Sequence, residues 1–127
     1  MKHILIVDDD PVAPLILKKN LELIQVNQET ITFSNGEEAY AYFKKKYNEK
    51  ENYYVFLDIN MPLMNGWDFL NSIDSFINKA NTHIYILTSS INKLDMDKAT
   101  QYTLIEKYLS KPINKEVLKT IKEENKW

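Results

Sequence analysis

The chain has 127 residues, of which 44% are hydrophobic and 27% charged, and it carries a formal net charge of −2 and no cysteine. This length suits one domain with one real core. The absence of cysteine excludes disulfides, thiolate metal sites and cysteine nucleophiles, and the charge balance gives no basic surface for nucleic acid or for a membrane.

No apolar run approaches the length of a membrane span. The apolar run near the N-terminus is four residues long and continues into three aspartates, so it does not fit a signal peptide. We therefore expect a cytoplasmic protein with no membrane insertion.

Short apolar runs alternate along the chain with stretches whose apolar residues repeat at helical spacing. The runs predict strands at residues 3–7, 30–33, 53–57, 83–87 and 107–110. The stretches between them predict helices at residues 11–24, 34–47, 66–80, 91–102 and 114–124. The predicted helix at 91–102 is short, polar and only weakly amphipathic.

Polar residues at the helix starts predict several caps. Asp10 is expected to cap the first helix, with Pro11 at its first position. Asn35 is expected to cap the second helix with Glu38 reaching back to it, and Asn114 to cap the last.

Five repeats of strand then helix predict a mostly parallel sheet with helices on both faces. Right-handed crossovers follow from the handedness rule for parallel strands. The sequence therefore predicts an open, doubly wound α/β domain.

Polar side chains follow four of the predicted strands: Asp8, Asp9 and Asp10; Asp58; Thr88 and Ser89; Ser110 and Lys111. Ligands of open α/β sheets bind outside the carboxyl ends of the strands. Each group alone has an ordinary explanation, since aspartates cap helices, threonines form turns and most lysines are solvated. Those explanations do not account for all four groups meeting at one edge.

The residue types at this edge narrow the chemistry. Oxygen ligands without cysteine or histidine favour a hard cation such as Mg²⁺ or Mn²⁺. A lysine opposite the metal suits a phosphoryl oxygen, and the combination matches the groups used in phosphoryl transfer. Asp58, at the end of an apolar strand, is the favoured nucleophile, and its product would be an aspartyl phosphate.

Four segments resemble the successive signatures of the receiver domain of bacterial response regulators: ILIVDDD, VFLDINMPLMNG, ILTSS and YLSKPI. The resemblance spans the whole chain. It implies a flavodoxin-like three-layer sandwich of the (βα)5 type, with a five-stranded parallel sheet in the order 2-1-3-4-5. The chain ends about where this fold ends, so we expect a stand-alone, chemotaxis-regulator-like receiver domain over residues 1–127, with no output domain.

The resemblance assigns roles to the acidic residues. Asp58 matches the phosphoacceptor. Asp8 and Asp9 match the acidic pair that places Mg²⁺, with Asp9 and Asp58 as direct ligands and Asp8 acting through water. Asn60 matches the position whose backbone carbonyl completes the metal site.

The remaining matched positions concern the phosphoryl group and the switch. Lys111 matches the lysine that contacts the phosphoryl group, and Pro112 the proline that follows a cis peptide bond. Thr88 matches the switch hydroxyl, Tyr108 the aromatic switch residue, and Ser89 a small residue that leaves room for the phosphoryl group. The segment QYTLIEKYLSKP departs from the family by lacking a small Gly-Ala pair before the last strand.

The implied function is that of a receiver in a two-component or phosphorelay system. A histidine kinase or a histidine phosphotransfer protein would supply the phosphoryl group. Phosphorylation would then change the surface of the fourth helix, fifth strand and fifth helix for an unknown downstream protein. We expect a monomer or a weak phosphorylation-dependent dimer, and no enzyme activity beyond self-phosphorylation and autodephosphorylation.

The main alternative is a small Mg²⁺-dependent phosphatase with an aspartyl nucleophile. That function needs a second carboxylate for acid–base work close after the nucleophile, and Asn60 stands two residues on. A nucleotide or flavin binder would need a phosphate-cradling loop after the first strand, where the acidic residues 8–10 would repel phosphate. His3 and His83 fall at the opposite edge of the sheet and are interpreted as structural.

Overall fold

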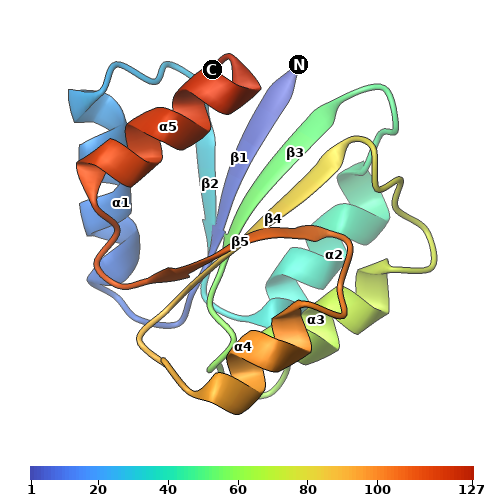
Figure 1. Ribbon diagram of the computed structural model, residues 1–127. Helices are drawn as coiled ribbons and strands as arrows, with labels where there is room; N and C mark the ends of the chain where they lie inside the picture. The colour runs from blue at the N-terminus through green and yellow to red at the C-terminus, as the bar shows by residue number, and fades with distance from the viewer.

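The computed structural model describes residues 1–127 as one parallel sheet between two layers of helices (Figure 1). The strands are β1 (Lys2–Val7), β2 (Thr30–Phe33), β3 (Asn52–Leu57), β4 (Thr82–Thr88) and β5 (Ile105–Ser110). The helices are α1 (Ala13–Leu23), α2 (Gly36–Lys46), α3 (Gly66–Ile73), α4 (Lys93–Ala99) and α5 (Lys115–Asn125). The strand order β2-β1-β3-β4-β5 confirms the expected doubly wound α/β fold. None of the helices has both the length and the apolar content needed to cross a membrane.

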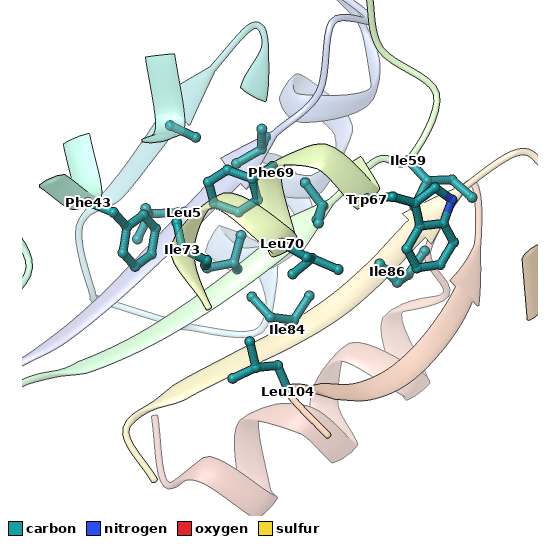
Figure 2. Close-up of a cluster of buried hydrophobic side chains, with 14 of the residues drawn as sticks. Leu5, Phe43, Ile59, Trp67, Phe69, Leu70, Ile73, Ile84, Ile86 and Leu104 are labelled. Carbon is teal, nitrogen blue, oxygen red and sulfur yellow. The ribbon is translucent and has the colours of Figure 1, made fainter. Parts of the chain in front are cut away.

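Helices α1 and α5 cover one face of the sheet, and α2, α3 and α4 cover the other (Figure 1). Alternate residues of a strand therefore enter different cores: Ile4 and Ile6 pack toward α1 and α5, whereas Leu5 and Val7 pack toward α2 and α3. Burial on both faces explains why the central strands are almost continuously apolar. Figure 2 shows the larger core, with side chains of α3 against those of β4.

Most helix starts are capped by an asparagine. The side chains of Asn35, Asn92 and Asn114 each accept a backbone N–H of the first turn of their helices, which confirms the predicted caps at Asn35 and Asn114. Glu38, however, contacts Ser34 rather than the backbone of Asn35.

The predicted cap at Asp10 is wrong. Helix α1 begins at Ala13, after Val12, with no side-chain cap. The Asp10 carboxylate instead accepts the Val12 N–H at 2.8 Å, and the Asp10 N–H donates to Asp8 at 2.9 Å. Residues 8–12 are thus held in a tight turn, so the helix begins only at Ala13.

Two helices, α3 and α4, are much shorter than predicted, whereas α1 and α2 are shorter by a few residues. Helix α3 ends at Ile73 rather than near residue 80; turn hydrogen bonds to the Ile73 carbonyl follow at Phe76 and Ile77, and the Asn78 N–H then donates to the Tyr47 hydroxyl at 2.7 Å. Helix α4 has seven residues, of which only Ala99 is buried. This agrees with the weak amphipathic pattern of residues 91–102.

The two termini meet at the amino ends of the strands (Figure 1). Lys2 Nζ donates to the Lys126 carbonyl at 2.6 Å. The Trp127 ring packs edge-on against Tyr54 and Phe56, with centroid distances of 5.3 and 6.2 Å. The last residue therefore covers part of the core between the sheet, α1 and α5, a role that its sequence position does not indicate.

Candidate functional site

Three carboxylates converge where β1 and β3 end. Val7 and Leu57 are paired in the parallel ladder, so the residues that follow them lie side by side. Carboxylate oxygens of Asp8, Asp9 and Asp58 all lie within 4.8 Å of one another. Asp8 and Asp58 are almost fully buried, with 5% and 6% exposure, whereas Asp9 is exposed. The predicted acidic cluster is therefore present.

Lys111 brings one positive charge to this cluster. It follows β5, and its Nζ lies 2.8 Å from Asp8 Oδ2 and 3.0 Å from Asp58 Oδ2. Its own N–H donates to the Thr88 carbonyl at 2.9 Å, and the Lys111–Pro112 peptide bond is cis. The structure thus brings the predicted lysine within contact distance of the predicted phosphoacceptor.

The charges at this edge do not balance, because one lysine faces three carboxylates. Burial and the neighbouring charge of Asp58 raise the pKa of Asp8, against the opposing effect of Lys111. Burial alone would lower the pKa of Lys111, but its hydrogen bonds to Asp8 and Asp58 raise it overall. The lysine therefore stays charged, and excess negative charge remains.

This donor set fits a hard divalent cation. All the acidic ligands are oxygens, they lie close together, and they come from rigid strand ends. Backbone N–H groups orient two of them: that of Asp10 donates to Asp8, and that of Asn60 donates to Asp58 Oδ1 at 3.0 Å. Mg²⁺ uses such carboxylates and retains water positions that a phosphoryl oxygen can take. The carbonyl of Asn60 as a further ligand stays a prediction.

The two predicted switch residues converge on a residue that the sequence does not single out. Thr88 is fully buried at the end of β4, and its Oγ1 accepts the Ser90 N–H at 3.2 Å. Tyr108 is half-buried on β5, and its hydroxyl donates to the Ser90 carbonyl at 2.8 Å. Burial, and then the charge of Asp95, raise the pKa of Tyr108. No sequence pattern marks Ser90, because its importance arises from contacts with three separate elements.

Gly66 is a second residue whose importance appears only in the structure. It begins α3 after an Asn65–Asp68 capping box, which confirms the predicted helix start at residue 66. Its N–H donates to the Ile59 carbonyl at 3.1 Å. A Cβ at Gly66 would lie 2.7 Å from Ile59 Cα and 2.8 Å from the Asp58 carbonyl oxygen. Glycine therefore lets the helix closely approach the backbone of residues 58 and 59.

A cavity of about 360 Å³ opens between α1 and the turn from β5 to α5. Its polar lining includes Lys111 and Ser89. Its apolar lining includes Val12 and Ile16 of α1, which are 56% and 43% exposed. The cavity offers space for a bound group directly beside the Lys111 side chain.

The sequence model of the response regulator receiver domain matches residues 4–123. Among curated proteins, the chain is 31% identical over 120 residues to the peroxide stress-activated histidine kinase mak3 of Schizosaccharomyces pombe, covering 91% of this chain and 5% of that protein. It is 25% identical over 118 residues to the sensor histidine kinase CheAY of Helicobacter pylori, covering 93% of this chain and 14% of that protein. The chain thus corresponds to a small part of these longer relatives.

Solved structures share the fold. A two-component response regulator from Cytophaga hutchinsonii superposes with a TM-score of 0.84 at 21% identity, covering 98% of this chain and 96% of that one. The chemotaxis protein CheY4 of Vibrio cholerae superposes with a TM-score of 0.74 at 25% identity, covering 97% and 98%. With the family match over nearly all residues and the acidic cluster in place, this chain belongs to the response regulator receiver domain family.

Proposed function

We propose that Asp58 accepts a phosphoryl group from a histidine kinase or a histidine phosphotransfer protein, and that the chain acts as a receiver in two-component or phosphorelay signalling. One observation carries this proposal: the buried Asp58 carboxylate has Lys111 Nζ at 3.0 Å and two further carboxylates beside it. A buried carboxylate next to other carboxylates destabilises the fold unless a bound cation compensates its charge. Retaining it is expected where the carboxylate binds a cation and reacts with an anionic group.

The transfer step uses groups that are already in place. An oxygen of Asp58 attacks phosphorus and forms a new P–O bond, while the bond from phosphorus to the donor nitrogen or acyl oxygen breaks and the leaving group keeps the electron pair. Lys111 Nζ donates to a phosphoryl oxygen and offsets its charge. The Asn60 N–H holds Asp58 Oδ1 in a fixed orientation.

Asp8, Asp9 and Asp58 would hold Mg²⁺, or Mn²⁺, together with the Asn60 carbonyl. When bound, the ion would neutralise part of the carboxylate charge and part of the charge on the incoming phosphoryl group. The cavity beside Lys111, with its exposed apolar rim on α1, would receive the donor.

Phosphorylation would act on a partner through the surface of α4, β5 and α5. The Thr88 side chain would move toward the new phosphoryl group and donate a hydrogen bond to it. The Tyr108 ring would then rotate inward into the space that Thr88 leaves. Ile91, Leu94 and Met96 expose apolar surface around α4, which suits contact with a downstream protein.

We propose no enzymatic turnover beyond self-phosphorylation and autodephosphorylation. A phosphatase is disfavoured because Asn60 stands where a second acid–base carboxylate would be needed.

The test is the intact mass of the purified protein after exposure to a small acyl phosphate, with and without Mg²⁺. Wild type should gain one phosphoryl group only when Mg²⁺ is present, and Asp58→Asn should gain none. Asp74→Asn, an exposed aspartate at the end of α3, is the matched control and should behave as wild type. An adduct that persists in Asp58→Asn would contradict the assignment.

A further inference from the structure

We propose that Ser90 is a positioning residue that links the Thr88 hydroxyl to helix α4, with Asp95 as its partner on the helix. This inference rests on the proposed function, because it concerns how phosphorylation of Asp58 reaches the partner-binding surface. The new element is the hydrogen bond between the Ser90 side chain and Asp95. The sequence alone assigns no role to either residue.

Each polar group of Ser90 binds a different element. Its N–H donates to Thr88 Oγ1 at the end of β4, at 3.2 Å. Its carbonyl accepts the Tyr108 hydroxyl from β5, at 2.8 Å. Its Oγ donates to Asp95 Oδ2 on α4, at 3.2 Å. A displacement of Ser90 therefore changes bonds to both switch residues and to the helix.

The two ends of α4 are held differently. At its C-terminal end, Lys98 Nζ lies 4.9 Å from the centroid of the buried Trp67 ring, and Tyr102 stacks on the same ring at 5.4 Å. At its N-terminal end no residue is buried, and Leu94 is 77% exposed. The Asn92 cap and the Ser90–Asp95 bond are the side-chain hydrogen bonds found there. Hydrogen bonds rather than packing thus set the position of the start of α4.

The hydroxyl chemistry of Thr88 makes the link responsive to phosphorylation. Thr88 Oγ1 accepts from Ser90, so its single proton stays available for another acceptor, such as a phosphoryl oxygen on Asp58. When Thr88 moves to donate that proton, Ser90 must follow or lose its bond. Asp95 is bound to the Ser90 side chain, so the start of α4 follows as well, while Trp67 keeps the other end in place.

The test is amide hydrogen exchange of residues 93–96, measured in Mg²⁺ alone and in Mg²⁺ with beryllium fluoride as the phosphoryl mimic. Ser90→Ala deletes only the Oγ link and keeps the backbone N–H and carbonyl that bind Thr88 and Tyr108. Asp95→Asn removes the charged acceptor from the other side of the link. Asp97→Asn is the matched control, because Asp97 is an exposed aspartate two residues along the same helix.

In wild type, beryllium fluoride should change the exchange of these amides. In Ser90→Ala and Asp95→Asn, exchange without the mimic should be about fivefold faster, the equivalent of one ordinary hydrogen bond. The change on adding the mimic should shrink by a similar factor, an effect that a merely structural role would not produce. Asp97→Asn should match wild type.

A full wild-type response to the mimic in Ser90→Ala would overturn the inference. Acyl-phosphate labelling of the wild-type protein separates this failure from failure of the proposed function. If Asp58 becomes phosphorylated while Ser90→Ala keeps the full response, only the link through Ser90 is wrong. If wild type takes up no phosphoryl group, the proposed function itself is wrong.

Discussion

At the amino ends of the strands each histidine has one carboxylate partner, whereas at the carboxyl ends Lys111 contacts two of three clustered carboxylates. His3 Nε2 lies 2.5 Å from Glu51, and His83 contacts Glu106. Both histidine rings also stack on tyrosines of β3, at centroid distances of 5.0 and 4.9 Å. The amino edge is thus paired and covered, which agrees with a structural role for both histidines.

The carboxyl edge is built from the same strands but leaves negative charge uncompensated. Unpaired buried charge destabilises a fold, so evolution retains it mainly where a ligand supplies the missing charge. The two edges therefore differ in how their carboxylates are paired: each contacts its own histidine at the amino edge, whereas three lie beside one lysine at the carboxyl edge.

Removing the lysine should have the largest effect. Lys111→Met should lower the free energy of unfolding by about 3 kcal/mol in metal-free buffer at neutral pH, because two buried carboxylates lose their only cation. Urea denaturation measures this loss, with Lys115→Met on the exposed start of α5 as the control. The loss should shrink at lower pH, since burial and Asp58 raise the pKa of Asp8 and protonation removes its charge. A loss that is independent of pH would contradict the charge explanation.

Crowding the backbone of residues 58 and 59 should have an intermediate effect. Gly66→Ala should cost about 2 kcal/mol of stability, because the new Cβ meets backbone atoms of residues 58 and 59. Phosphorylation from an acyl phosphate should slow as well, since the loop that carries Asp58 must shift. Asp74→Ala, at the exposed residue that follows the same helix, is the control for both measurements. Wild-type stability and rate in Gly66→Ala would show that the close approach is unimportant.

Disturbing the amino edge should have the smallest effect. A hydrogen bond from His3 lowers the pKa of Glu51 below its ordinary value of 4.5, against a smaller effect of burial. The stability from this pair is therefore present above that value and is lost as the pH falls through the lowered pKa. Urea denaturation of wild type and Glu51→Gln should show a modest gap at neutral pH that closes in acid. Phosphorylation should be unchanged, and a slowed rate would mean that the two edges are not independent.

The fold could be predicted from the sequence because the pattern of apolar residues in each segment agrees with the strand–helix alternation of the whole chain. Alternating apolar runs and helical stretches give five strand–helix units, and the polar residues after the strands mark the carboxyl edge. Helix ends were less predictable. Asp10 has the right residue type for a cap, but its carboxylate binds Val12 in the turn that holds Asp8. The apolar pattern of α3 continues past Ile73, but the chain there forms turns and then binds Tyr47 through the Asn78 N–H.

Within the site, sequence reasoning found the groups that carry charge but missed those that position them. Asp58 and Lys111 stand out because each is a polar residue beside an apolar run. Ser90 and Gly66 do not, because their roles depend on contacts across the fold: Ser90 with β4, β5 and α4, and Gly66 with the backbone after Asp58. Small residues in loops have many ordinary explanations, and only the three-dimensional arrangement selects among them.

A calorimetric titration of Mg²⁺ into the unphosphorylated protein tests most directly whether the uncompensated charge serves a cation. Asp9→Asn is the informative variant, because Asp9 is exposed and its replacement should leave the fold intact. Glu51→Gln disturbs the opposite edge and is the control. We predict saturable binding at one site in wild type and in Glu51→Gln, and strongly weakened binding in Asp9→Asn. Equal binding in all three proteins, or none in wild type, would contradict the assignment of the carboxyl edge.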